Sequence, residues 1–190
     1  MHDQDLSAAL ATELDGSFER LMLTYQNRLY AFALRLTGNP QDAEEIIEDA
    51  FVHAYRALAR YPAERIQGLA LQAWLYQITL NVFRNRVRGR RLRLVPLEQP
   101  GEWMDPAFEG DKAGRPEAVV ERAELREKLA ALIAALPERH RVAVVLRHVQ
   151  GLGYGEMAVL LRQPVGTVKA NVHRGIRLLR EALTKHGEWR

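Results

Sequence analysis

Residues 152–183 read LGYGEMAVLLRQPVGTVKANVHRGIRLLREAL, and this stretch decides the fold. It predicts two helices that flank a break at Arg162-Gln163, because Pro164 suits the first position of a helix, where its missing N–H costs nothing. Apolar residues of the second helix recur at spacings of three and four, as in an amphipathic helix. They are Val165, Val168, Val172, Ile176 and Leu179. A short helix, a tight turn and a longer basic helix are typical of a DNA-binding helix-turn-helix. An ordinary helical hairpin with a solvated basic face is the alternative.

The composition excludes several classes of protein. None of the 190 residues is a cysteine, which excludes disulfides and thiolate metal sites and fits a cytoplasmic location. No apolar run reaches the roughly eighteen residues of a membrane span, so we expect no membrane insertion. The acidic N-terminus lacks the order of a secretory signal. The histidines show no HxxxH or HExxH pairing, so we expect no metal, no cofactor, no small-molecule substrate and no catalysis.

Charge is segregated along the chain. Six of the ten residues of 84–93 are arginine, and the range 162–190 holds seven lysines and arginines. Between these two blocks, residues 94–120 carry six acids against two bases. Two basic blocks that flank an acidic segment indicate contact with a polyanion at two separate places. Aromatic residues near the first block fit the stacking that unpaired nucleic-acid strands need. These are Tyr61, Trp74, Tyr76 and Phe83.

The chain as a whole is predicted to be all-α. We expect two small helical domains, at 16–92 and 117–185, joined by a flexible acidic linker rich in proline and glycine at 93–116. Residues 1–15 are weakly patterned, so we expect them to be weakly ordered. Residues 186–190 form a tail.

Three helices are predicted in the first domain. One begins near Ser17, a plausible cap, and stops at Gly38-Asn39-Pro40; the second covers 42–58. A loop at 61–68 precedes the third. The predicted buried stripe of the second helix is Ala43, Ile47, Ala50, Phe51, Ala54 and Leu58. The predicted core positions of the third helix are Leu71, Trp74, Leu75, Ile78 and Val82.

Two further helices precede the helix-turn-helix. One is predicted from about Pro116 to Leu136, and another follows the Leu136-Pro137 break. The predicted stripe of the first of them is Val120, Leu125, Leu129, Leu132, Ile133 and Leu136.

Four segments together resemble bacterial sigma factors of the extracytoplasmic-function group of the sigma-70 family. In the first half they are FALRLTGNPQDAEEIIEDAFVHAYRAL (32–58) and AWLYQITLNVFRNRVRGRR (73–91). In the second half they are LPERHRVAVVLRHVQGLGYGEMAVLL (136–161) and PVGTVKANVHRGIRLLREAL (164–183). A helix-turn-helix sequence alone occurs in many regulators, whereas the two halves in this order are specific for this group of sigma factors.

The resemblance implies a region-2-like helical bundle and a region-4-like helix-turn-helix. It implies an alternative-type sigma factor that binds core RNA polymerase at its clamp coiled coil and flap. Such a protein recognises the −35 and −10 elements of promoter DNA, promotes DNA opening and is controlled by an anti-sigma factor.

The resemblance also assigns residues in the first half. The helix at 42–58 matches the segment that docks on the clamp coiled coil, which makes Glu45, Glu48, Asp49 and Val52 an interface. The loop at 61–68 and the helix after it match the part that reads the −10 element, where a base is flipped out of the duplex. The −10 candidates are Arg65, Gln67, Asn81, Arg84, Asn85 and Arg88.

In the second half the basic helix matches the one that enters the major groove at the −35 element. The −35 candidates are Arg162, Thr167, Lys169, Asn171, His173, Arg174 and Arg177. Lysine or arginine can reach guanine O6/N7, and asparagine can pair with an adenine edge. The family commonly has Ser-Arg after the basic residue at 169, whereas this chain has Ala170-Asn171, so its −35 preference is expected to differ.

Two other readings compete with this one. A conventional helix-turn-helix regulator with an N-terminal sensor or dimerisation domain would explain 152–183, but not the arginine block or the helix at 73–91. A helical enzyme or metal protein would need a cluster of catalytic or ligating residues, which the spacing of the histidines and carboxylates does not supply.

Overall fold

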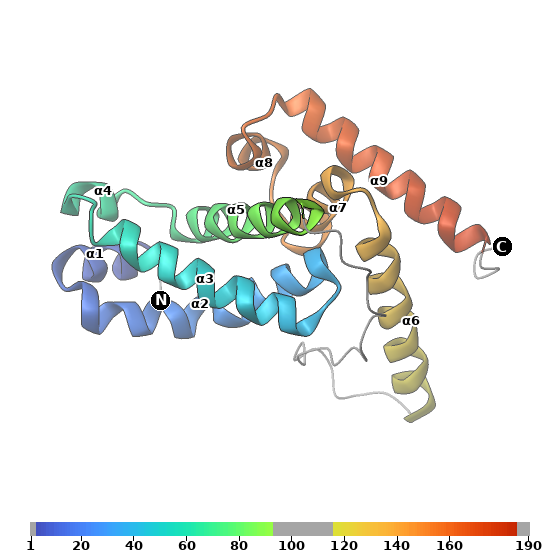
Figure 1. Ribbon diagram of the computed structural model, residues 1–190, viewed down its shortest axis with the longest axis horizontal. Helices are drawn as coiled ribbons and strands as arrows, with labels where there is room; N and C mark the ends of the chain where they lie inside the picture. The colour runs from blue at the N-terminus through green and yellow to red at the C-terminus, as the bar shows by residue number, and fades with distance from the viewer. Residues whose placement is uncertain (1–2, 93–115, 186–190) are drawn as a thin grey trace. The chain divides into compact units, whose positions relative to one another are not determined.

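The computed structural model describes residues 3–92 and 116–185, and every regular element within those ranges is a helix (Figure 1). The all-α prediction is therefore confirmed for the described residues. They divide into two compact units, 3–34 with 41–92 and 35–40 with 116–185. Most of the predicted linker and the predicted tail lie outside the described residues.

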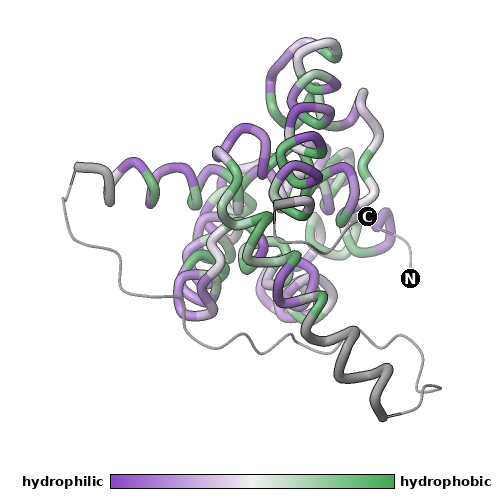
Figure 2. Tube along the Cα trace, turned by 90° about the vertical axis from the view of Figure 1, so that its right-hand side faces the viewer, coloured by the Kyte–Doolittle hydropathy of each residue, from purple (hydrophilic) through white to green (hydrophobic). Residues whose placement is uncertain are grey.

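Hydrophobic and hydrophilic residues alternate along the helices, as burial of one helix face requires (Figure 2). Among the helices described, none is both long enough and apolar enough to cross a membrane.

The first unit is built from a series of helices of very different lengths. They are α1 (Asp3–Thr12), α2 (Leu14–Thr37), α3 (Pro40–Leu58), α4 (Ala63–Gln67) and α5 (Leu71–Leu92). The predicted stripe of α3 is buried throughout, and Ile46 joins it. Edge-to-face aromatic contacts strengthen the packing, because ring edges and faces carry opposite partial charge. The centroids of Phe32 in α2 and Tyr76 in α5 are 5.0 Å apart.

Two predictions for short segments are wrong. Residues 1–15 are not weakly ordered, because α1 occupies most of them and buries Leu6 and Leu10. The segment 61–68 is not all loop, because α4 lies within it. Helix α2 also begins at Leu14, before the predicted start near Ser17. Each short helix is stabilised by packing on distant parts of the chain, which a local pattern does not reveal.

The predicted core face of α5 is partly wrong. Leu71 and Leu75 are buried as expected, but Trp74, Ile78 and Val82 are only half-buried. The fully buried positions continue instead through Tyr76, Thr79, Leu80 and Phe83. Apolar residues surround most of this helix, so their spacing alone does not select one face.

The second unit contains α6 (Pro116–Ala135), α7 (Glu138–Val144), the π-helical turn η1 (Val145–Val149), α8 (Tyr154–Leu161) and α9 (Val165–Lys185). The stripe predicted for α6 is correct only toward its end. Ile133 and Leu136 are buried, whereas Leu125 and Leu129 are exposed. The core lies where α7 and α8 pack on α9. Val142, Val145, Met157 and Val168 are among its buried side chains.

At Gly175, α9 lies directly against α7. A Cβ atom at this position would lie 2.5 Å from Val144 Cγ2 and 3.2 Å from the His140 carbonyl oxygen. The first distance is shorter than Cβ atoms show in proteins, and the second is tight, so the absence of a side chain at Gly175 lets the two helices pack.

We expect Gly175→Ala to lower the free energy of unfolding of the second unit by about 1–3 kcal/mol, the usual cost of overpacking. Gly166→Ala in the same helix is the matched control, because a Cβ there meets nothing within 4 Å. Alanine forms helix better than glycine, so this control should raise stability by up to about 1 kcal/mol. Chemical denaturation of the full chain measures both. Equal effects of the two substitutions would contradict the close packing.

His140 predicts a pH dependence of stability. Its side chain is buried in α7, and this burial, together with the charge of Arg139, lowers the pKa of the imidazole. Below about pH 6.5 the unfolded chain therefore binds a proton that the folded chain does not. The stability that the neutral His140 contributes is present above that pH and lost as the pH falls below it.

His140→Leu should reduce the loss of stability between pH 7.5 and 5.5, whereas His173→Leu, at an exposed position, should not. Thermal unfolding of the three proteins at both pH values measures this, and an unchanged loss in His140→Leu would contradict the prediction.

Candidate functional site

Helices α8 and α9 form a compact helix-turn-helix. At the start of α8, the Gly153 N–H donates a hydrogen bond to Glu156 Oε2 at 2.6 Å. The turn is made by Arg162, which adopts a left-handed backbone with φ 52° and ψ 48°. This conformation lets the Gln163 N–H donate to the Ala158 carbonyl at 3.0 Å and closes the end of α8. The turn therefore has the geometry of a glycine position, occupied by an arginine.

Most of the predicted −35 residues share the solvent-facing side of this motif. The exposed ones are Arg162, Thr167, Lys169, His173, Arg174 and Arg177. Lys169 Nζ lies 5.6 Å from the centre of the Tyr154 ring, and Arg147 Cζ lies 4.8 Å from the same centre. These cations are held at the start of α8 by the electron-rich ring. The exposed surface of α9 is therefore cationic, and one of its cations, Lys169, packs near the Tyr154 ring.

Asn171 differs from the other −35 candidates. It is only 9% exposed, and its Nδ2 lies 3.5 Å from Gln163 Oε1. It follows the buried Val168 by three residues and precedes Gly175 by four, so the helical period turns it toward the core. This burial argues against the prediction that Asn171 reads a base. The side chain instead joins the turn to α9.

The predicted −10 residues occupy α4 and one line along α5. Asn81, Asn85 and Arg88 are exposed at spacings of four and three, so they face the same way, and Arg84 beside them is half-buried. Arg65 and Gln67 are exposed on α4.

Aromatic rings lie beside the −10 candidates of α4. The Arg65 guanidinium carbon lies 3.7 Å from the centre of the Tyr61 ring, whose centroid is 6.3 Å from that of Trp74. This arrangement joins a cation, a stacked ring and a second ring at the start of α5. It offers the stacking and charge that an unpaired nucleotide strand needs.

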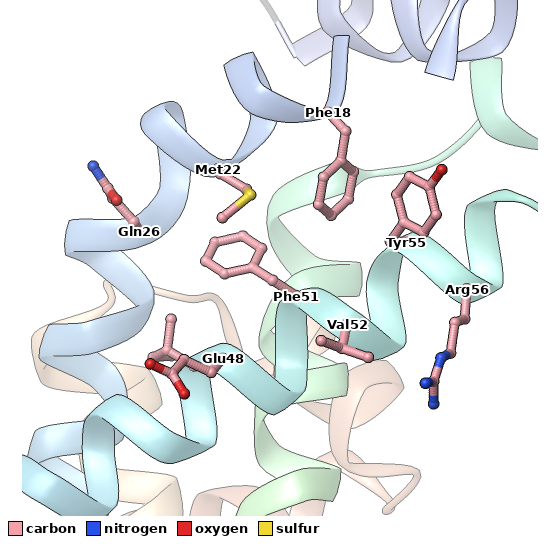
Figure 3. Close-up of a pocket in the computed structure, with 9 residues that line it drawn as sticks. Phe18, Met22, Gln26, Glu48, Phe51, Val52, Tyr55 and Arg56 are labelled. Carbon is pink, nitrogen blue, oxygen red and sulfur yellow. The ribbon is translucent and has the colours of Figure 1, made fainter. Parts of the chain in front are cut away.

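A groove lies between α2 and α3 (Figure 3). It encloses about 530 Å³. Phe18 and Met22 of α2 point toward Phe51 and Tyr55 of α3, with Val52 beside them. Polar residues accompany these apolar ones: Gln26, Glu48 and Arg56. Val52 is 47% exposed, which makes it an apolar side chain available to a partner.

The walls of this groove are held in place by specific contacts. The Phe18 ring meets the Tyr55 ring edge-to-face with centroids 5.1 Å apart. The Tyr55 hydroxyl donates to Asp15 Oδ1 at 2.6 Å, and this hydrogen bond raises the pKa of Tyr55, so the hydroxyl remains protonated. These contacts fix the shape of the groove, which has an apolar floor and charged margins.

The four predicted polymerase-binding residues are not equivalent. Val52 and Glu48 line the groove. Glu45 and Asp49 form ion pairs with Arg86 of α5, the latter with 3.7 Å between Arg86 Nη1 and Asp49 Oδ2. The arginine block was expected to contact a polyanion, but Arg86 instead forms ion pairs with carboxylates of α3. The other block members at 90, 91 and 93 lie outside the described side chains.

The sequence prediction missed several groove residues, among them Phe18, Met22 and Tyr55. Phe18 and Met22 lie four residues apart in α2, a spacing that a buried helix face would also show, but Met22 is 37% exposed. Tyr55 follows Val52 by three residues on α3, and that spacing was the available signal for an apolar docking patch.

The chemistry of these surfaces is that of binding. Among the described residues, no three His, Cys, Asp or Glu side chains come together as metal ligands would. What the described surfaces offer is charge, amides, rings and one apolar groove.

Comparison with known proteins gives two family matches. The family described as "Sigma-70 region 2" matches residues 21–93, and the one described as "Sigma-70, region 4" matches residues 126–179. The first match covers α3, α4, α5 and all groove residues except Phe18, and the second covers α8 and most of α9.

Curated relatives match over most of the chain. The ECF RNA polymerase sigma factor SigE of Mycolicibacterium smegmatis is 34% identical over 171 residues, which are 90% of this chain and 63% of that protein. The RNA polymerase sigma-H factor of Pseudomonas aeruginosa is 33% identical over 187 residues, covering 96% of this chain and 92% of the relative. Thus the chain spans less than two thirds of the first relative and nearly all of the second.

A solved structure shares the fold. The sigma factor RpoE of Bartonella quintana, crystallised in complex with the anti-sigma factor NepR, aligns with a TM-score of 0.66 at 24% identity. The alignment covers 88% of this chain and 96% of that one.

Proposed function

The chain belongs to the extracytoplasmic-function group of the sigma-70 family of RNA polymerase sigma factors, and from this premise we propose how its surfaces initiate transcription. The protein binds core RNA polymerase, directs it to −35 and −10 promoter elements and promotes opening of the DNA. We assign residues 16–92 to region 2 and residues 117–185 to region 4. The observation that carries the proposal is the presence in one chain of an apolar groove with charged margins, a surface of exposed amides and cations beside aromatic rings, and a helix-turn-helix.

The groove between α2 and α3 is the proposed docking site for the clamp coiled coil of the polymerase. Val52 and Tyr55 would be covered by an apolar residue of the coiled coil, and Glu48 would meet a basic one. Glu45 and Asp49 lie on the same helix, but their pairing with Arg86 offsets part of their charge. Apolar burial therefore contributes more to affinity than charge does. A contact of region 4 with the flap completes the proposed interface.

Control by an anti-sigma factor follows from the same groove. The RpoE relative is known in complex with one. A regulator that covers Val52 and Tyr55 would exclude the polymerase by occupying the same apolar surface. Anti-sigma factor and polymerase would then compete for one site.

The −10 element is the proposed ligand of α4 and α5. Asn81 and Asn85 would contact the bases of the non-template strand, and Arg84 and Arg88 its phosphates. Arg65 and Gln67 would border the flipped base, whose extrusion costs a few kcal/mol of stacking that the pocket must recover. The stacked Arg65 and Tyr61 support this assignment, because they place a ring and a cation together.

The −35 element is the proposed ligand of α9. Thr167, Lys169, His173, Arg174 and Arg177 face the major groove, and Arg162 contacts a phosphate. Asn171 is withdrawn from this set, since it faces the core. Ala170 is exposed but has no polar group to offer a base. The −35 preference therefore depends on fewer polar side chains than the Ser-Arg of many relatives would supply.

The dependence of DNA binding on core polymerase tests this function. The purified chain should bind core polymerase, and sequence-specific promoter binding should require that complex. A conventional regulator would bind its site without polymerase. Gel shifts with chain alone, core alone and both together distinguish the two, and specific binding by the chain alone would contradict the proposal.

A further inference from the structure

Helix α1 packs directly on α4, although fifty residues lie between them in the sequence. The residues of α1 that face inward are Leu6, Ser7 and Leu10, each no more than 2% exposed. Ile66 of α4 is buried as well, at 5% exposed. A helix of five residues is too short to be stable by itself, so α4 depends on this packing for its position.

A single side chain joins the two backbones. The Ser7 hydroxyl lies 3.0 Å from the Gln4 carbonyl oxygen and 3.2 Å from the Gln67 carbonyl oxygen. The first is a local contact within α1, whereas the second spans sixty residues. Carbonyls in the last turn of a helix have no partner inside that helix. The one hydroxyl proton of Ser7 is therefore shared between the Gln4 carbonyl and the end of α4, at the residue whose side chain is a −10 candidate.

The other end of α1 is attached to α2. The Tyr25 hydroxyl donates to Asp3 Oδ1 at 2.6 Å, and Tyr25 is 1% exposed. Burial and the neighbouring carboxylate of Asp3 raise the pKa of Tyr25, so its proton remains available to donate. Helix α1 is thus held by α2 at its start and by α4 at its middle.

We propose that α1 is a positioning element for capture of the −10 base, with Ser7 as its key residue. By holding the Gln67 carbonyl, Ser7 sets the direction in which the Arg65 and Gln67 side chains leave α4. The pocket is then preorganised before the base arrives, and binding the base does not have to order a short helix. This inference rests on the proposed role of α4 at the −10 element.

The test measures base capture separately from the rest of promoter binding. Polymerase reconstituted with the full chain is bound to forked promoter DNA whose −10 segment is single-stranded, with either the intact strand or one abasic position. The wild-type protein should bind the intact strand more tightly than the strand that lacks the captured base. In Ser7→Ala that ratio should shrink by roughly two- to tenfold, the range of one neutral hydrogen bond. Affinity for the abasic strand should stay the same.

Thr12→Ala is the matched control, because Thr12 is an exposed α1 residue whose hydroxyl bonds only the local Ala8 carbonyl. It should keep the wild-type ratio. Asp3→Ala loosens α1 from α2 without touching α4, and it should reduce the ratio in the same direction even if Ser7→Ala folds poorly. A wild-type ratio retained in both Ser7→Ala and Asp3→Ala would overturn the role of α1. A wild-type protein indifferent to every abasic position would instead overturn the −10 role of α4 itself.

Discussion

Val52→Glu is expected to weaken binding of the chain to core RNA polymerase by roughly 100-fold or more. Val52 stands in the α2–α3 groove, half exposed beside Phe51 and Tyr55. On docking it loses its remaining contact with water, and an unpaired carboxylate placed there costs about 3–5 kcal/mol. Fluorescence anisotropy of labelled protein titrated with core polymerase measures the change.

Leu23→Glu is the matched control, because Leu23 is a 63% exposed residue of α2 that does not line the groove. It should bind polymerase as the wild type does. Val52→Thr keeps the shape of the side chain and should cost far less than Val52→Glu. Equal loss in Val52→Glu and Leu23→Glu would mean that the effect is not specific to the groove.

Lys169→Ala and Arg174→Ala are each expected to reduce discrimination at the −35 element by about tenfold or more. Each exposed cation can make a bidentate contact to guanine, and such a contact discriminates by roughly 1–3 kcal/mol. The measurement compares polymerase reconstituted with each variant on promoters with a native or a scrambled −35 element. Opening of a template already melted at −10 should be unaffected.

Asn81→Ala provides the opposite phenotype. It should impair DNA opening at −10 and leave −35 discrimination intact, because Asn81 lies on α5. Asn171→Ala should lower the stability of the second unit and leave −35 discrimination largely intact. If Asn81→Ala changed −35 preference and Lys169→Ala changed opening, the assignment of the two surfaces would be reversed.

The long amphipathic helices were predictable from the sequence. In α3 and α9, apolar residues recur with the helical period over several turns, and burial follows that period. The turn at Arg162 and Pro164 was likewise visible, since proline marks the start of the next helix.

Two helices of the first unit, α1 and α4, were missed from local pattern. They pack on each other, and this long-range contact leaves no signal in the local sequence. The face of α5 was misjudged for a different reason, because its sequence offers apolar residues in nearly every direction. In the structure Tyr76 is buried and its ring packs on Phe32 of α2, whereas Trp74 is half-buried.

For the candidate site, exposure of the side chains followed the sequence better than their contacts did. The cations of α9 are exposed, whereas Asn171 in the same helix is buried. Glu45 and Asp49 lie on the predicted face of α3. Their ion-pair partner, Arg86 of α5, lies more than thirty residues further along the chain. Local sequence patterns do not show ion pairs between different helices. They also do not show the groove that Phe18 and Tyr55 line.

Run-off transcription by core polymerase on a library of randomised promoters tests the central claim most directly. With the wild-type chain added, the transcribed templates should be enriched in two motifs at a fixed separation, one at −35 and one at −10. Lys169→Ala should blur the first motif only, and Asn81→Ala the second only. Transcription without any enriched motif, or no stimulation of core polymerase at all, would contradict the account.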